Sequence, residues 1–184
     1  MQRQSVLFGV QTRLTEPEFD RLFLDLYPQI CAAAFRVVGD SEEAEELAAE
    51  AFWKLWNHPP AVVENLPGWL YRVVINLSYN RIRAARRRAK REELGSRAEL
   101  TGEVLASPSE AAERNQEIER VQSVLRSLSE REVQLLTLHA MSLSYKEIAA
   151  ALQVSPGNIG SWLSRAEEKF ESKYRMGDTN APQR

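Results

Sequence analysis

Between Ser144 and Leu163 the sequence reads Ser-Tyr-Lys-Glu-Ile-Ala-Ala-Ala-Leu-Gln-Val-Ser-Pro-Gly-Asn-Ile-Gly-Ser-Trp-Leu, two short helical patterns separated by a turn. Ser155 followed by Pro156 favours a helix start, because serine caps backbone N–H groups and proline fits a first turn. The spacing of the apolar residues lets both helices close on one core, formed by Ile148, Leu152, Val154, Ile159 and Trp162. This pattern predicts a helix-turn-helix, whose second helix enters the major groove of DNA. An ordinary helical hairpin is the alternative for this segment taken alone.

The second helix of this motif offers a small set of polar side chains to a DNA groove. The residues expected to face the groove are Asn158, Ser161, Ser164 and Arg165. The backbone N–H groups that follow Ser155 add an anion site, because the N-terminus of a helix attracts a phosphate without needing a cation.

The remainder of the chain also has helical periodicity, with apolar residues recurring every three or four positions. No stretch alternates as a strand would, so the sequence predicts an all-α fold. We expect Pro28 to kink or divide the first helix, and Asp40 or Ser41 to cap the second. The predicted architecture is two small helical domains, residues 16–93 and 109–175, joined by a flexible linker over 94–108.

A basic stripe follows the apolar face of the predicted third helix. Residues 81–91 hold seven cations and no acid, although the whole chain has a net charge of 24 − 26 = −2. Such a stripe neutralises phosphates, and the aromatic and asparagine side chains upstream suit stacking on unpaired bases. A solvated basic face beside core aromatics is the alternative. The residues concerned are Trp69, Tyr71, Asn76, Tyr79, Asn80, Arg81, Arg83, Arg86, Arg87, Arg88, Lys90 and Arg91.

The second predicted helix has an acidic row on its exposed side, formed by Glu43, Glu46, Glu50 and Trp53. An acidic row that includes an exposed aromatic is a candidate protein-binding face, and a solvated helix face is the alternative.

Composition and motif content exclude several other classes. The sequence has no phosphate-binding glycine loop, nucleophile motif or Cys/His cluster, so we expect no catalytic site, no metal site and no cofactor. Its apolar runs are too short for membrane insertion, and the single cysteine, Cys31, forms no internal disulfide. These features predict a non-enzymatic binding protein of the cytoplasm.

The order of these segments resembles a bacterial sigma factor of the sigma-70 family, in the extracytoplasmic-function group that retains only the second and fourth sigma domains. The resemblance covers residues 16–174. The matching segments are Asp40-Ser-Glu-Glu-Ala-Glu-Glu-Leu-Ala-Ala-Glu-Ala-Phe-Trp-Lys-Leu-Trp56, Gly68-Trp-Leu-Tyr-Arg-Val-Val-Ile-Asn76, Leu143-Ser-Tyr-Lys-Glu-Ile-Ala149 and Leu163-Ser-Arg-Ala166.

The resemblance implies a promoter-recognition subunit that binds core RNA polymerase. The acidic row, Glu43, Glu46, Glu50 and Trp53, would dock on the clamp of the largest subunit, and the second domain on the flap of the other large subunit. The minus-10 element would be melted and read by Trp69, Asn76, Tyr79, Asn80 and Arg83, with Arg86, Arg87 and Arg88 on phosphates. The minus-35 element would be contacted by Ser155, Asn158, Ser161, Ser164 and Arg165. An anti-sigma factor is the further expected partner.

Three departures from the family pattern bear on this prediction. Gln153 stands where family members usually carry a glycine in a left-handed turn, and Gly160 and Trp162 replace basic residues. Ala49 replaces a glutamine of the acidic helix. A weakly basic recognition helix predicts shallow reading of the minus-35 element. The alternatives to a sigma factor are a one-component helix-turn-helix regulator and a module that sequesters a polymerase or sigma partner without reading DNA.

Overall fold

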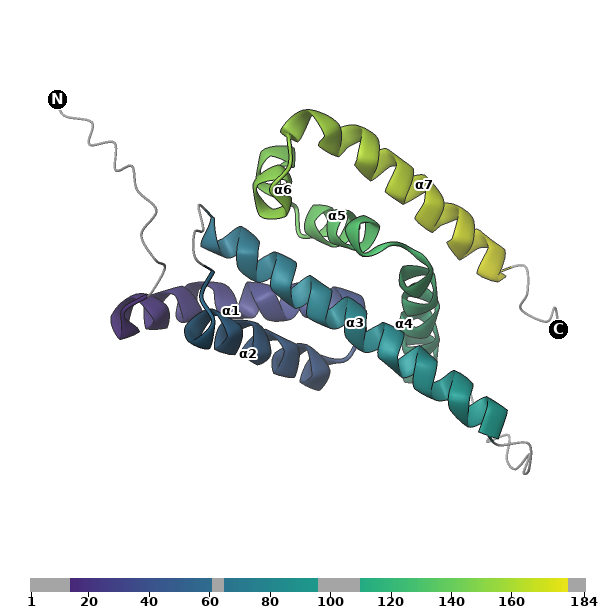
Figure 1. Cartoon of the computed structure of the whole chain (residues 1–184). Coiled ribbons are helices and arrows are strands. Elements are labelled where there is room, and N and C mark those ends of the chain that lie inside the picture. Colours follow the sequence, from purple (N-terminus) through teal and green to yellow (C-terminus); the bar gives the residue numbers. More distant parts are fainter. Residues whose placement is uncertain (1–13, 61–64, 96–109, 179–184) are drawn as a thin grey trace.

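The computed structural model describes residues 14–60, 65–95 and 110–178, and within these ranges all regular structure is helical (Figure 1). The prediction of an all-α fold is confirmed. In chain order the elements are α1 (Glu16–Val38), α2 (Ser41–Asn57), α3 (Leu66–Gly95), α4 (Glu110–Ser127), α5 (Glu130–Ala140), α6 (Tyr145–Leu152), the 3₁₀ turn η1 (Pro156–Asn158) and α7 (Ile159–Asp178).

Side-chain caps set several of these helix boundaries. Asp40 accepts a hydrogen bond of 2.8 Å from the Glu43 N–H at the start of α2, as its place in the sequence predicts. Reciprocal capping boxes open α1, α5 and α6. The first helix ends at Gly39, whose φ of 74° is a left-handed C-cap that glycine adopts without steric cost.

The first helix is continuous through Pro28, so the expectation that this residue divides α1 is wrong. Pro28 lies on the exposed side of the helix, whereas Ile30 and Ala33, one turn later, are fully buried against α2 and α3. This tertiary packing holds the helix together across the proline.

The third helix ends later than expected. Asn65 caps its first turn, because its side-chain oxygen accepts a hydrogen bond of 3.0 Å from the Gly68 N–H. The helix starts at Leu66 and extends to Gly95, two residues into the predicted linker. The remainder of that linker lies outside the described residues.

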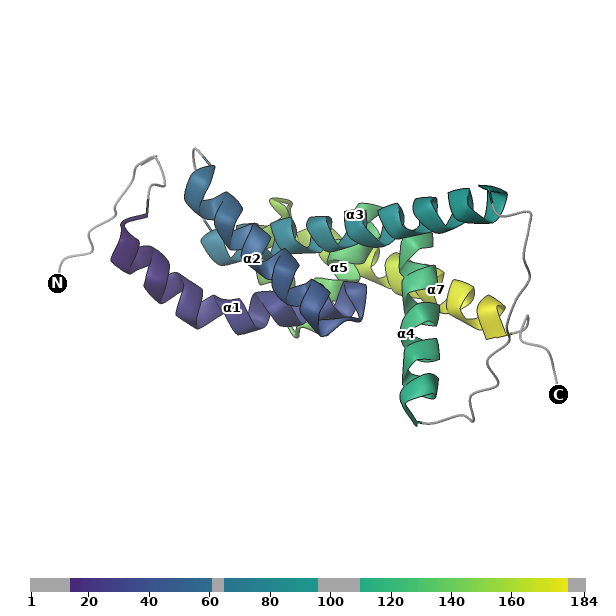
Figure 2. The same cartoon turned by 90° about the horizontal axis from the view of Figure 1, so that it is seen from below.

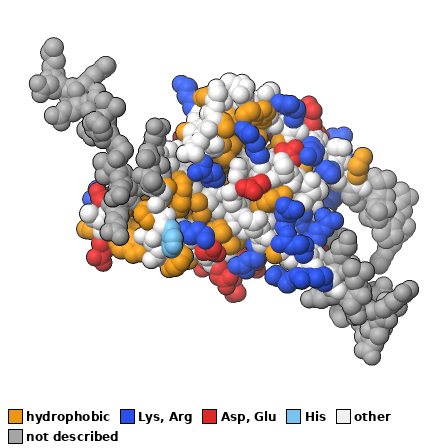
Figure 3. All heavy atoms as spheres, in the orientation of Figure 1, with side chains coloured by type: hydrophobic (Ala, Val, Ile, Leu, Met, Phe, Trp, Pro, Cys, Tyr) orange, Lys and Arg blue, Asp and Glu red, His pale blue; other side chains and the backbone are white. Residues whose placement is uncertain are grey.

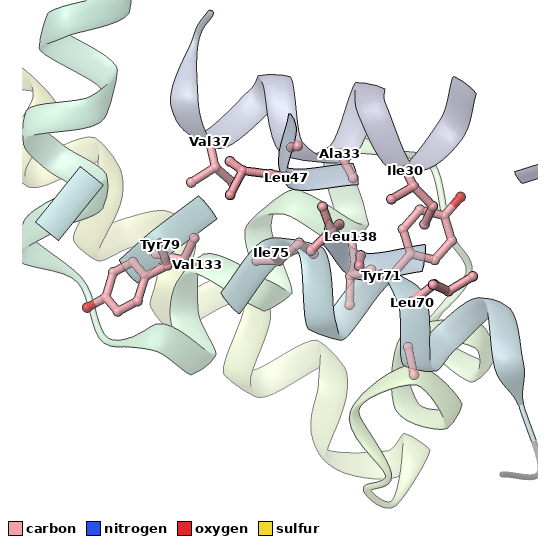
Figure 4. Close-up of a cluster of buried hydrophobic side chains, with 14 of the residues drawn as sticks. Ile30, Ala33, Val37, Leu47, Leu70, Tyr71, Ile75, Tyr79, Val133 and Leu138 are labelled. Carbon is pink, nitrogen blue, oxygen red and sulfur yellow. The ribbon is translucent and has the colours of Figure 1, made fainter. Parts of the chain in front are cut away.

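The long helix α3 occupies the centre of the molecule. Helices α1 and α2 pack on one side of it, and α4, α5 and α6 on the other (Figure 1). Seen from below, α4 crosses the C-terminal half of α3 (Figure 2). One continuous cluster of buried side chains runs through both groups of helices, from Ile30 and Leu47 through Ile75 to Val133 and Leu138 (Figure 4). The two halves of the chain thus share a core, which their separate patterns in the sequence do not show.

Candidate nucleic-acid and polymerase interfaces

The outer face of α2 presents acidic and aromatic side chains to solvent. Trp53 is 57% exposed, and the Glu46 side chain is 69% exposed. Glu43 lies at the edge toward α3, where Arg81 donates a hydrogen bond of 3.2 Å to its carboxylate. Glu50 pairs with Lys54 at 3.0 Å, one turn along the same helix. Glu46 also lies 3.7 Å from Arg81 Nη2, but its side chain and Trp53 are the most exposed of the four residues predicted for this face.

An additional aromatic residue adjoins this face and was not among the predicted contacts. Trp56 is 47% exposed, and its ring packs edge-on against Phe19 of α1 at 4.9 Å between centroids. Its position three residues after Trp53 places the two tryptophans on neighbouring parts of the helix surface. The three-residue spacing from Trp53 is the sequence feature that could have identified Trp56 as part of this face.

The exposed part of α3 carries a concentration of positive charge. The side chains of Asn80, Arg83, Arg86, Arg87 and Arg88 are all exposed. In the space-filling view, Lys and Arg side chains gather over the C-terminal half of α3 (Figure 3). The structure therefore brings these five predicted residues together on one solvent-facing helix.

Two other residues predicted for the minus-10 element face the second half of the chain instead. Tyr79 is 4% exposed, and its hydroxyl donates a hydrogen bond of 2.6 Å to the backbone carbonyl of Leu128. Gln134 donates a hydrogen bond of 2.5 Å to the side-chain oxygen of Asn76. Trp69 is half-buried and packs against the core. In this arrangement Tyr79 and Asn76 are engaged with α5 and the turn that precedes it rather than presented to a nucleic acid.

The helix-turn-helix consists of α6, a turn at Gln153 and the segment that continues from η1 into α7. Gln153 has φ 57° and ψ 48°, the left-handed conformation expected at this turn. Its backbone N–H bonds the carbonyls of the last turn of α6, which closes the helix. At the other end of α6, hydrogen bonds from the Ser144 hydroxyl and backbone N–H lower the pKa of Glu147 below its ordinary value.

The expected groove-contacting residues form an exposed row at the start of the recognition helix. Ser155, Asn158, Ser161, Ser164 and Arg165 are all exposed. The Arg165 Nε donates a hydrogen bond of 3.0 Å to the Ser161 carbonyl, which keeps the stem of this arginine along the helix. Trp162 is half-buried and packs against the core. All five residues predicted to contact the groove are therefore accessible to solvent.

Within the residues that the structure describes, no group of three or more His, Cys, Asp or Glu side chains is placed to hold a metal ion. None of the described helices has the length and apolarity required to span a bilayer.

Comparison with known proteins decides what these surfaces belong to. The family model for sigma-70 region 2 matches residues 22–88, and the model for sigma-70 region 4 matches residues 118–170, so the two together cover more than half of the chain. The chain belongs to the sigma-70 family. Its two matched regions correspond to α1 to α3 and to α4 to α7, and this organisation is that of the extracytoplasmic-function sigma factors.

Curated relatives are sigma factors as well. The RNA polymerase sigma-H factor of Pseudomonas aeruginosa is 29% identical over 166 residues, which cover 83% of this chain and 84% of that protein. The extracytoplasmic-function sigma factor SigE of Mycolicibacterium smegmatis is 27% identical over 159 residues, 84% of this chain and 60% of that protein.

Solved structures share the fold at lower sequence identity. The sigma factor RpoE in complex with the anti-sigma factor NepR from Bartonella quintana aligns with a TM-score of 0.51 and 23% identity, covering 85% of this chain and 96% of that one. CnrH in complex with the cytosolic domain of CnrY aligns with a TM-score of 0.56 and 19% identity, covering 91% of this chain and 92% of that one. This sigma factor therefore has the fold of both.

Proposed function

We propose that this sigma factor directs RNA polymerase to promoters through three separate surfaces. The α2 face, centred on Glu46 and Trp53, docks on the clamp of the largest core subunit. The α3 row from Asn80 to Arg88 contacts the opened minus-10 element. The row along the recognition helix, from Ser155 to Arg165, contacts the minus-35 duplex while the second domain rests on the flap of the other large subunit.

The observation that carries this proposal is the cationic surface of α3. Arg83, Arg86, Arg87 and Arg88 project into solvent from one helix of a chain whose net charge is negative. Phosphate contacts supply much of the affinity of a protein for DNA, and a local concentration of arginines provides them where the overall charge does not. The neighbouring exposed Asn80 has the donor and acceptor groups that base recognition needs.

The contacts between the two halves add a step to this function. Hydrogen bonds from Gln134 to Asn76 and from Tyr79 to Leu128 engage part of the minus-10 surface within the protein itself. In our proposal these contacts break when the sigma factor assembles with core polymerase, because each half then takes up its own site on the polymerase. Asn76 and Tyr79 become available to DNA after this opening.

The expected partners and compartment follow from the same proposal. Both solved neighbours are complexes, one with an anti-sigma factor and the other with a cytosolic domain, and we propose an anti-sigma partner for this chain as well. Sigma factors confer promoter specificity on the polymerase, which performs the catalysis, and we propose the same non-catalytic role in the cytoplasm here.

Reconstituted transcription tests the proposal directly. Purified protein is added to core polymerase on a library of promoter fragments, and promoter-dependent transcripts are counted. A sigma factor gives transcripts from a defined subset of fragments only when core polymerase is present. A one-component regulator would bind duplex DNA without core polymerase, and a sequestering module would never support initiation.

A further inference from the structure

The first half of the recognition helix has little positive charge for a helix expected in the major groove. Lys169 lies 2.9 Å from both carboxylate oxygens of Glu132, so its charge is neutralised within the protein. Glu167, Glu168 and Glu171 add negative charge along the same helix. In the first half of the helix, Arg165 is the one basic side chain. Any additional cation at this interface has to come from a neighbouring element.

Helix α5 supplies such a cation beside the recognition helix. The guanidinium carbon of Arg131 lies 3.9 Å from the centroid of the Trp162 ring. Arg131 is exposed, and the described residues give it no carboxylate partner. A guanidinium in contact with an aromatic face is attracted to the ring, and its N–H donors remain available for a carboxylate or phosphate.

Trp162 places this cation along the predicted DNA row. Within α7, residues three positions apart lie on the same side of the helix, so Trp162 is beside Arg165. Asn158 ends the 3₁₀ turn η1, directly before α7 begins at Ile159. Asn158 and Arg165 are exposed members of that row. Trp162 itself is half-buried, because its ring packs between the core and the Arg131 guanidinium. Arg131 thus lies on α5, next to the recognition helix and at the edge of its predicted DNA-contacting residues.

We infer that Arg131 binds a phosphate of the minus-35 duplex and that Trp162 is its positioning residue. This inference rests on the proposed role of the helix-turn-helix in promoter binding. A residue that flanks the recognition helix faces the DNA backbone rather than the base edges, and arginine matches the geometry of a phosphate with paired N–H donors. Arg131 of α5 thereby supplies a positive charge beside position 162, where this chain has a tryptophan.

The salt dependence of promoter binding tests this inference. The full chain is assembled with core polymerase, and the affinity of the holoenzyme for a promoter selected by the unmodified protein is measured from 50 to 200 mM salt. We expect Arg131→Ala to reduce the slope of log K against log salt by about 0.9, the value for one lost phosphate contact on duplex DNA. The weakening should be about three- to tenfold at the lowest salt and should shrink as salt rises. The preferred minus-35 sequence should stay the same.

Two further variants separate charge from packing. Arg131→Lys keeps the cation and should restore the slope of the unmodified protein. Arg175→Ala removes an exposed arginine 13 residues beyond Trp162, about 20 Å away along α7, and should leave the slope unchanged. Circular dichroism checks that each variant keeps its helical content.

Several outcomes would overturn the inference. A slope for Arg131→Ala equal to that of Arg175→Ala would show that Arg131 only packs on Trp162. A changed minus-35 preference at constant slope would place Arg131 on bases instead of a phosphate. If binding by the unmodified holoenzyme is insensitive to removing all DNA upstream of the minus-10 element, the proposed role of the helix-turn-helix itself fails, which differs from failure of Arg131 alone.

Discussion

The Arg72 guanidinium donates a hydrogen bond of 2.8 Å to the side-chain oxygen of Gln153, the residue in the left-handed turn of the helix-turn-helix. This bond joins the first part of α3 to the turn between α6 and α7. The two backbones also approach closely here, because a Cβ atom on Gly68 would lie 2.8 Å from the Ala151 Cα. The turn that shapes the DNA-binding motif is therefore also a contact between the two halves of the chain.

Replacing Gln153 tests how much the left-handed backbone costs. Gln153→Gly and Gln153→Ala both remove the bond to Arg72, but only glycine adopts φ near 57° without a steric penalty. We expect the glycine variant to exceed the alanine variant by about 1 kcal/mol in free energy of unfolding. Urea denaturation of the two variants measures this difference. Equal stabilities would show that the turn relaxes away from the left-handed region.

Tyr79→Phe tests the contact between the halves. The substitution leaves the ring in the core but removes the hydroxyl that donates to the Leu128 carbonyl. The loss of the bond to a buried backbone acceptor should lower the free energy of unfolding by about 1–3 kcal/mol. As a control, Tyr145→Phe removes a hydroxyl from a tyrosine that is 48% exposed and should change stability by less than about 0.5 kcal/mol. Equal effects in denaturant unfolding would argue against the contact in solution.

Local chemistry in the sequence was sufficient to predict the helices and the helix-turn-helix. Capping residues such as Asp40 and Ser144 act on backbone groups a few positions away, so their effect is visible in the sequence. The left-handed turn at Gln153 is equally local. Ser155 makes no side-chain cap hydrogen bond, and the 3₁₀ turn η1 precedes the start of α7 at Ile159. The possibility that Pro28 divides α1 was wrong because the packing that overrides the cost of this proline comes from other helices.

The sequence could not show which residues become buried or hydrogen-bonded where the two halves of the chain meet. Tyr79 and Asn76 lie among exposed polar and basic residues of α3, and this neighbourhood favoured nucleic-acid contact for both. Their partners, Leu128 and Gln134, lie some fifty residues away, and no local pattern connects them. The contact of Arg131 with Trp162 was missed for the same reason, since α5 and α7 are separate in the sequence.

The predicted polymerase-docking face is tested by Glu46→Lys and Trp53→Ala. Both side chains project from α2 into solvent, so their replacement should leave the fold intact. Removing a central aromatic or reversing a central charge of an interface typically costs about 2 kcal/mol, and we expect affinity for core polymerase to fall about thirtyfold. Glu168→Lys, an equal charge reversal on exposed α7, should bind normally. Unchanged affinity of both α2 variants in a core-binding titration, with normal circular dichroism, would remove this assignment.

The exposed row of α3 should divide into base-reading and phosphate-binding residues. Arg86→Ala should weaken all promoters similarly and reduce the salt slope by about 0.7 on single-stranded or 0.9 on duplex DNA. Asn80→Ala should instead alter which bases are preferred in the minus-10 element, because an amide pairs with base edges. Selection from a library randomised across the minus-10 element distinguishes the two effects. An unchanged selection with Asn80→Ala would show that this residue reads no base.

From the composition of the recognition helix we expect the minus-35 element to be the weaker determinant of promoter choice. Arginine or lysine paired with guanine is the commonest specific contact in the major groove and contributes about 1–3 kcal/mol of discrimination, and the first half of this helix offers one such residue, Arg165. Phosphate contacts at the Ser155 turn would hold the register of the helix without specifying a base. Scrambling the minus-35 sequence should therefore reduce transcription less than scrambling the minus-10 sequence, and transcription from a promoter library measures both. A sharp minus-35 motif that disappears with Arg165→Ala would contradict this prediction, because it would mean that one arginine and its polar neighbours are enough to read the element in full.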